Sequence, residues 1–249
     1  ARRQVPVVHR QGARGNLSIY DLTTGRSRGL TSEGNLSGSD PGFAEYSVPS
    51  PDGRSVAFAW RGTTYDLRIV GLDGSKTQVL RAGGEGITHQ YPVAWSPDGK
   101  HVLAEIKKTD GNLDMILVSV PDGSEKLLKA VGKNPPPGGV FSPDGRYIAW
   151  AAKAGLSLYD LQTGTESLLI SDRTNPSVLG WFQDGRHILF SSERSGSADA
   201  WLVAVAGGRA QGEPIFIKKN WGNRPMGLTR SGAFYFGVNN NVGDVKVAE

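Results

Sequence analysis

Short apolar runs separated by polar turns follow one another along the chain, and this pattern predicts an all-β fold. The runs at 55–60 and 147–150 are almost continuously apolar, which is typical of strands buried on both faces. The runs at 17–22 and 156–161 alternate between apolar and polar residues, as strands with one buried face do. The chain is therefore predicted to consist of many short strands joined by tight turns.

One turn sequence returns along the chain. Ser-Pro-Asp-Gly followed by Arg or Lys occurs at 50–54, 96–100 and 142–146, and weaker copies occur at 182–186 and 229–233. Proline presets φ, the aspartate can bond its own backbone, and glycine takes the positive φ that closes the turn. We interpret the aspartate as a turn residue, because a functional carboxylate has no reason to recur at every turn. Copies spaced by about 40–50 residues indicate a repeat architecture.

Each repeat contains four predicted strands. Strand A precedes the Ser-Pro-Asp-Gly turn and strand B follows it, whereas strand C leads through a second glycine turn into strand D. Four-stranded antiparallel units arranged around an axis make a β-propeller. We predict one β-propeller domain over residues 1–249, six-bladed, with incomplete first and last blades. The predicted blades cover about 1–30, 43–80, 90–129, 138–170, 177–217 and 225–249.

The first and last repeats each supply three strands. The first lacks strand A and its turn, and the last stops after strand C. We expect from this that the chain is a piece of a longer protein. Incomplete blades would present unpaired strand edges, which favour pairing with another chain.

The repeat resembles the TolB-type propeller repeat. The resemblance rests on the repeated turn, the apolar strand after it, loops such as 192–196 and the second glycine turn. That repeat is related to the WD and tricorn-protease repeats, and the resemblance covers nearly the whole chain. It implies a bacterial protein in the periplasm or another extracytoplasmic space. It also implies a role as a protein-binding module, a substrate gate or a sensor domain, although some members are enzymes.

Composition and charge narrow the classes of partner. The 249 residues include no cysteine, so disulfides and thiolate metal sites are excluded. No apolar run approaches the roughly 18 residues that span a bilayer, and no signal peptide is recognisable. The net charge is +4, but the variable loops carry nearly equal numbers of basic and acidic residues. Such loops offer no basic track for phosphates, so nucleic acid is not expected as a partner.

The predicted binding site lies among the B–C and D–A loops, which vary between repeats, because binding residues concentrate on loops held by a rigid scaffold. Residues just before strand A should ring the mouth of the propeller channel. The mixture of polar and aromatic groups there suits a protein partner, a peptide end or a small polar ligand, and a water-filled channel is the alternative. The candidate binding residues are Glu45, Tyr46, His89, Gln90, Asn175, Trp221, Asn223 and Arg224.

Aromatic residues at repeated positions have a different expected role. Trp95, Phe141 and Trp181 each lie four residues before a turn glycine, so we expect them to fill the space between blades. Trp221 lies outside this pattern, in a D–A loop. It is therefore the tryptophan that we predict to contact a ligand.

Residues that could catalyse a reaction are few. His101 and His187 occupy repeat positions, His9 lies in a terminal strand, and only His89 is expected at the channel mouth. One histidine beside Gln90 is too few for a metal site, and no nucleophile elbow or phosphate loop is present. We predict no catalytic residue, metal or cofactor, and a non-catalytic binding or sensor module. The alternatives are a metal-dependent polysaccharide lyase-like enzyme and the substrate-gating propeller of a serine peptidase.

Overall fold

The computed structural model describes most of the chain, and the described part contains strands and turns but no helix. The all-β fold class predicted from the sequence is therefore confirmed. The described residues are 6–11, 15–21, 24–34, 42–133, 138–221, 224–228, 232–238 and 244–248.

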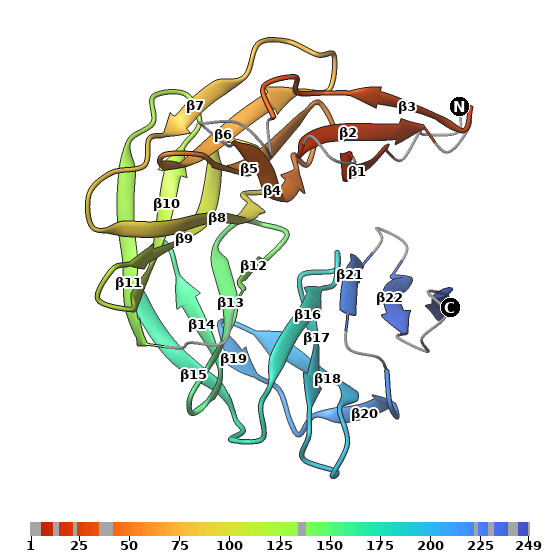
Figure 1. Ribbon diagram of the computed structural model, residues 1–249. Helices are drawn as coiled ribbons and strands as arrows, with labels where there is room; N and C mark the ends of the chain where they lie inside the picture. Colours follow the sequence, from red (N-terminus) through yellow and green to blue (C-terminus); the bar gives the residue numbers. More distant parts are fainter. Residues whose placement is uncertain are drawn as a thin grey trace. The chain divides into compact units, whose positions relative to one another are not determined.

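The chain divides into two compact units, residues 1–134 and 135–249. In the first unit, the described strands form three antiparallel sheets in which neighbours in sequence are neighbours in space (Figure 1). The first sheet contains β1 (Pro6–Gln11), β2 (Asn16–Asp21) and β3 (Arg26–Gly29). The second contains β4 (Phe43–Pro49), β5 (Ser55–Arg61), β6 (Tyr65–Gly71) and β7 (Gln78–Arg81). The third contains β8 (Ile87–Trp95), β9 (His101–Lys108), β10 (Asn112–Ser119) and β11 (Glu125–Lys133).

The described strands of the second unit also form three antiparallel sheets. The first contains β12 (Val140–Phe141), β13 (Tyr147–Ala152), β14 (Gly155–Asp160) and β15 (Thr165–Ser171). The second contains β16 (Ser177–Trp181), β17 (His187–Ser192), β18 (Asp199–Ala206), β19 (Arg209–Ala210) and β20 (Ile215–Lys218). The third contains β21 (Arg224–Leu228), β22 (Phe234–Val238) and β23 (Asp244–Ala248). Both β19 and β20 pair with β18, so the predicted strand D of this repeat is divided in two.

Each sheet is an antiparallel meander in chain order, which is the topology of a propeller blade. Among the residues that the structure describes, the sheets that begin at β1 and β21 contain three strands each. The count of six blades and the single domain over 1–249 stay predictions.

The Ser-Pro-Asp-Gly turns are closed by the same hydrogen bonds in different blades. The Ser50 hydroxyl donates to Asp52 over 2.6 Å, and the Asp52 carboxylate also accepts from the backbone N–H of Arg54 over 3.0 Å. Ser50 in turn accepts from the backbone N–H of Ser55 over 2.9 Å. The turns at 96–101 and 142–147 repeat this arrangement. The recurring geometry supports the interpretation of the aspartate as a turn residue.

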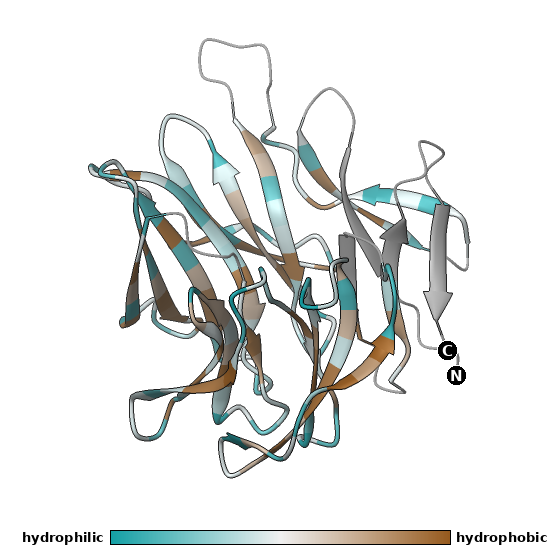
Figure 2. Cartoon of the chain, turned by 90° about the horizontal axis from the view of Figure 1, so that it is seen from below, coloured by the Kyte–Doolittle hydropathy of each residue, from teal (hydrophilic) through white to brown (hydrophobic). Residues whose placement is uncertain are grey.

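Apolar side chains fill the space between neighbouring sheets of the same unit. Apolar and polar residues alternate along many of the strands (Figure 2). Trp95 packs in a cluster formed by the sheets that begin at β4 and β8, and its indole N–H donates to the carbonyl of Val48 over 2.9 Å. Trp181 occupies the corresponding position in the second unit, within a cluster that includes Phe190 and Leu158. Both tryptophans are buried, so they fill the space between blades as the repeat pattern predicted.

The turn glycines give a direct test of this fold. Gly99 has φ +71°, and a Cβ added there would meet no atom within 4 Å, so only the backbone conformation opposes a side chain. We expect Gly99→Ala to lower the free energy of unfolding by about 1–2 kcal/mol, the cost of a left-handed residue. Gly84→Ala is the matched control, because Gly84 has equal space and no positive φ. Urea unfolding measures both variants, and equal stability of the two would contradict the turn assignment.

Candidate functional site

Four rings from two neighbouring sheets of the first unit lie against one another, and we call this cluster the aromatic site. Tyr46 is on β4, Tyr65 begins β6, and His89 and Tyr91 are on β8. Ring centroids are 4.2 Å apart for Tyr46 and Tyr91, 4.9 Å for Tyr65 and His89, and 5.5 Å for His89 and Tyr91. The cluster lies at the ends of the strands away from the Ser-Pro-Asp-Gly turns.

A β-bulge sets the direction of Tyr46. The register of β4 against β5 shifts between Glu45 and Val48, and within this bulge Tyr46 has φ 50°. A positive φ is rare for a bulky residue, and such strain is concentrated at functional sites. Bulges re-aim side chains, and Tyr46 is 57% exposed beside rings that are more buried. The backbone therefore presents this ring to solvent instead of to the core.

The His89 imidazole is held neutral near neutral pH. Burial lowers the pKa of His89, and the positive charges of Lys107 and Arg61 lower it further. Among the described residues, His89 Nδ1 and the Tyr65 hydroxyl are buried and have no hydrogen-bond partner. Buried polar atoms without a partner are uncommon, and this marks the aromatic site as a candidate functional site.

The Tyr91 hydroxyl stays protonated. Burial raises the pKa of Tyr91 far above its usual value, and Tyr46, Glu45 and a hydrogen bond with Tyr46 raise it further. The aromatic site therefore combines uncharged rings with basic Arg61 and Lys107 and acidic Glu45. This composition suits the binding of a polar ligand that carries an acidic group and an apolar part.

Gln90 is a buried residue that connects two strands of the aromatic site. It is fully buried, its side-chain carbonyl accepts from Arg81 Nη1 over 2.7 Å, and its amide donates to the carbonyl of Tyr65. Arg81 also pairs with Glu125 over 3.0 Å. Gln90 thus holds the start of β6 against β8, and it is a positioning residue.

The structure brings together some of the predicted binding residues and not others. Glu45, Tyr46, His89 and Gln90 meet in the first unit. Trp221, in the second unit, is only 4% exposed and packs in an apolar cluster with Phe234. Because it is buried, we do not include Trp221 in the candidate site. Asn223 lies outside the described residues, and so does the side chain of Arg224, the first residue of β21.

Two rings of the aromatic site were missing from the sequence prediction. Tyr91 follows His89 by two residues on one strand, a spacing that places both side chains on one face. Tyr65 is the first residue of β6, directly after the loop that follows β5. The period-two spacing could have predicted that Tyr91 lies beside His89. The contact between Tyr65 and His89 depends on how neighbouring blades pack, so the sequence alone does not predict it.

In the second unit, Asn175 lies beside a buried acidic network. Asn175 has φ 55°, and its side-chain amide donates to Glu193 over 3.4 Å. Nearby Asp172 is 6% exposed and accepts hydrogen bonds from Ser192 over 2.6 Å and from Arg194 over 2.7 Å. Burial alone would raise the pKa of Asp172, but hydrogen bonds from Ser192, Thr174 and Arg194 outweigh it and lower the pKa to about 2. The network ties the loop after β15 to the loop after β17.

Two kinds of feature are absent from the part of the chain that the structure describes. It holds no group of three or more His, Cys, Asp or Glu arranged to bind a metal ion. It also holds no helix with the length and hydropathy of a membrane span.

Comparisons with known proteins agree with the fold. No family model matches the chain. It is 26% identical over 187 residues to the uncharacterized peptidase YuxL of Bacillus subtilis. This match covers 74% of this chain and 26% of YuxL. It is 31% identical over 138 residues to the Tol-Pal system protein TolB of Anaeromyxobacter sp. strain K. This match covers 53% of this chain and 30% of that protein. The chain therefore spans about a quarter to a third of the curated relatives it matches.

Solved structures show the same architecture. TolB from Acinetobacter baumannii matches 98% of this chain, with a TM-score of 0.60 and 18% identity, over 65% of its own length. An oligogalacturonate lyase in complex with manganese matches 77% of this chain, with a TM-score of 0.59 and 19% identity, over 54% of its own length. The antiparallel blades and these likenesses define a β-propeller fold. Together with the sequence match to TolB, they make the chain a TolB-like propeller.

The electrostatics of the aromatic site can be tested through His89. Lys107 is the direct cross-strand neighbour of His89, and its charge disfavours the imidazolium form. We expect Lys107→Met to raise the pKa of His89, although burial and Arg61 will still hold it below its usual value. NMR titration of the imidazole measures this, with Lys76→Met as the control on an exposed loop. An unchanged or lower pKa in the Lys107 variant would contradict this description.

The buried Asp172 network predicts a pH dependence of stability. The pKa of Asp172 is about 2 in the folded chain and lies near 3.8 without these contacts, so the carboxylate stabilises the fold above about pH 4. This contribution is lost as the pH falls towards 2. We expect Asp172→Asn to cost about 1–3 kcal/mol at pH 6, since buried donors lose their acceptor.

Urea unfolding of the wild type and Asp172→Asn between pH 6 and pH 2.5 tests this expectation. The difference between the two proteins should stay constant above about pH 4 and shrink below it. A difference that does not change with pH would contradict the assigned role of the carboxylate.

Proposed function

We propose that this chain is a non-catalytic binding module that recognises a segment of a protein partner, or a small polar ligand, through the aromatic site. The observation that carries the proposal is the exposed ring of Tyr46, held at a positive φ against Tyr91 and beside His89. Rigid aromatic anchors with a polar group at one end are the residues that dominate binding surfaces.

The charges around the aromatic site indicate the chemistry of the ligand. Lys107 and Arg61 are close enough to His89 to lower its pKa. Both lie on the exposed side of their strands, where they would attract a carboxylate. The rings would receive an apolar or aromatic side chain. The favoured ligand is therefore an acidic peptide segment with an adjacent apolar residue.

The likeness to TolB supports a protein partner, because TolB is a protein of the Tol-Pal system. It also supports a bacterial, extracytoplasmic location, which we include in the proposal. Binding modules of this kind use the rigid blades to hold variable loops.

A second candidate is a propeller that works beside an enzyme. YuxL is described as a peptidase, and its match covers 74% of this chain, which favours a substrate-gating propeller. The fold shared with oligogalacturonate lyase keeps a lyase-like activity with a metal near His89 as a further alternative. Release of unsaturated product from oligogalacturonate in the presence of manganese would favour the lyase. A hydrolase domain in the complete gene product would favour the gate.

The binding proposal is tested with a random peptide library displayed on phage. We expect selection on the wild-type chain to enrich peptides in which an acidic residue neighbours an apolar one. Tyr46→Asn should weaken binding of the selected peptides at least about tenfold, because truncating a central aromatic anchor costs about 2 kcal/mol or more. Asparagine tolerates a positive φ, so the bulge is retained.

Val79→Ala is the matched control, since Val79 is exposed on β7 and lies outside the aromatic site. Peptides that bind the Tyr46 variant as tightly as the wild type, or that lose affinity equally in the Val79 variant, would place recognition elsewhere. The aromatic site would then not be the binding site.

A further inference from the structure

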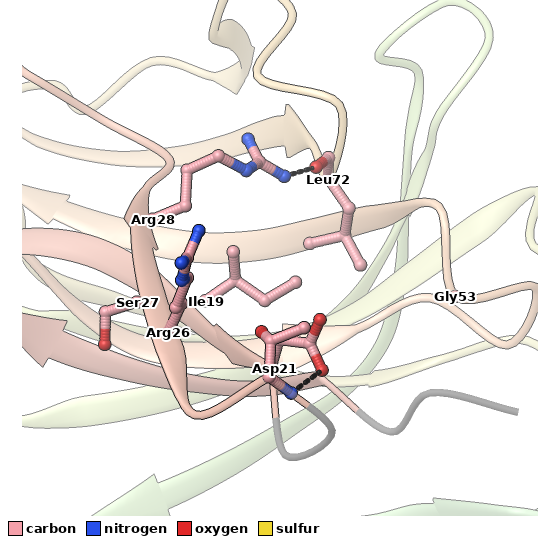
Figure 3. A pocket seen from close by; sticks show the side chains of 8 residues that line it. Ile19, Asp21, Arg26, Ser27, Arg28, Gly53 and Leu72 are labelled. Carbon is pink, nitrogen blue, oxygen red and sulfur yellow. Dashed lines mark hydrogen bonds between the residues drawn. The ribbon is translucent and has the colours of Figure 1, made fainter.

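We propose that a pocket at the turn end of the first unit binds a carboxylate group that is joined to a short apolar body. This pocket, here called the turn pocket, has a volume of about 610 Å³ (Figure 3). It lies between the β1–β3 sheet and the β4–β7 sheet. Its lining residues are Ile19, Asp21, Thr24, Arg26, Ser27, Arg28, Gly53 and Leu72.

The turn pocket is separate from the aromatic site. Gly53 belongs to the turn between β4 and β5, and Leu72 follows the end of β6. Tyr46 and Tyr65 lie towards the opposite ends of the same strands, where the variable loops are. The Ser-Pro-Asp-Gly turn recurs from blade to blade, but the first blade also places two arginines of β3 at this end. The two sites can therefore be tested independently.

Two guanidinium groups form the basic wall of the turn pocket. Arg26 and Arg28 are separated by one residue on β3, so both side chains project from the same face of the strand. Arg28 Nη2 donates to the carbonyl of Leu72, which fixes this guanidinium against the neighbouring sheet (Figure 3). Within the described part of the chain, the exposed side chain of Arg26 makes no hydrogen bond or ion pair. Arg26 thus has its fork of donors available for a planar carboxylate.

Two of the residues that line the turn pocket, Ile19 and Leu72, are apolar. Ile19 and Leu72 are partly buried and pack against the apolar cluster that contains Leu17, Val56 and Phe58. Because this cluster anchors both side chains, they present a fixed apolar surface to the pocket. A short aliphatic or aromatic group would bury area there, while its acidic end meets the arginines.

Asp21 limits the charge that the turn pocket accepts. Its carboxylate lies beside the basic wall and accepts from the backbone N–H of Thr24 over 3.3 Å (Figure 3). Two arginines and one aspartate leave a single net positive charge among the lining side chains. A monoanion matches that charge, whereas the second negative charge of a phosphate would be repelled by Asp21. The preferred ligand is therefore a carboxylate, either a free small acid or the C-terminal end of a peptide with an apolar last residue.

The test uses the full chain labelled with ¹⁵N and three probes of matched size or charge. Hexanoate carries both the carboxylate and the apolar body, hexanamide lacks the charge, and acetate lacks the apolar body. We expect hexanoate to shift the amide signals of Ile19, Arg28 and Leu72. Hexanamide and acetate should bind at least about tenfold more weakly, since each loses one of the two contributions.

Variants of Arg26 identify the group that binds the carboxylate. Arg26→Gln should weaken hexanoate binding about tenfold, because a charge-assisted hydrogen bond is lost. Arg26→Lys should restore part of the affinity, since it keeps the charge. Lys100→Gln is the control, because Lys100 is an exposed basic residue in the turn between β8 and β9 and does not line the turn pocket. Unfolding in urea confirms that each variant folds as the wild type does.

Some outcomes overturn the proposal. Equal binding of hexanoate and hexanamide would show that the arginines do not bind the carboxylate. Equal binding to the wild type and Arg26→Gln, or signal shifts confined to residues outside the turn pocket, would show that the pocket is not a carboxylate site. The source of the ligand is distinguished with acetyl-Ala-Ala-Leu. Tighter binding of this peptide than of hexanoate, lost on C-terminal amidation, indicates a peptide end, and the reverse order indicates a free acid.

Discussion

The aspartate of the Ser-Pro-Asp-Gly turn makes the contact on which the blades depend. Hydrogen bonds from the Ser50 hydroxyl and from the backbone N–H of Arg54 lower the pKa of Asp52, so the carboxylate is ionised and accepts both. Asp98 is held in the same way. The proline and glycine fix the backbone around this acceptor, and strands A and B leave the turn in a set register. That register brings Trp95 and its counterparts into the space between sheets. The turn therefore sets both the hairpin and the packing of one blade on the next.

Because the turn end of each blade is fixed, the residues at the other end can differ from one blade to the next. The bulge at Tyr46 illustrates this, since a bulky side chain at positive φ costs energy that the surrounding β4–β5 pairing has to offset. The register of strand A also shifts in β8, β16 and β21, close to the same distance before the turn. The bulge is thus a feature of the repeat, but the residue it presents changes from blade to blade. In β4 that residue is an exposed tyrosine beside His89 and Tyr91, and this makes one blade different from the others.

The sequence predicted the strands and turns well because their signals are local. Alternation, proline, aspartate and glycine act within a few residues, so the elements could be placed without knowing the neighbours. The candidate site depends on contacts between blades, and it could be predicted only in part. Glu45, Tyr46, His89 and Gln90 were found because the sequence pattern placed them just before strand A. In the structure they lie within β4 and β8, and their roles differ. Gln90 is buried beneath the rings. No local feature of the sequence distinguishes a buried residue at this position from an exposed one. Trp221 looked available because it lies in a loop, yet a loop residue can still fill a core beside Phe234.

The turn pocket follows from the same division between repeated backbone and variable side chains. The turn end of the first unit has a repeated shape, because Asp52 and glycines such as Gly53 fix its backbone. Repeated shape does not imply repeated chemistry. In the first blade the exposed strand β3 carries Arg26 and Arg28, and Arg28 reaches the carbonyl of Leu72 in the next blade. A single side chain that bridges two sheets can thus place charge beside an apolar surface without altering the turn. New binding chemistry on a propeller therefore needs little change in the backbone, and it can arise at either end of a blade.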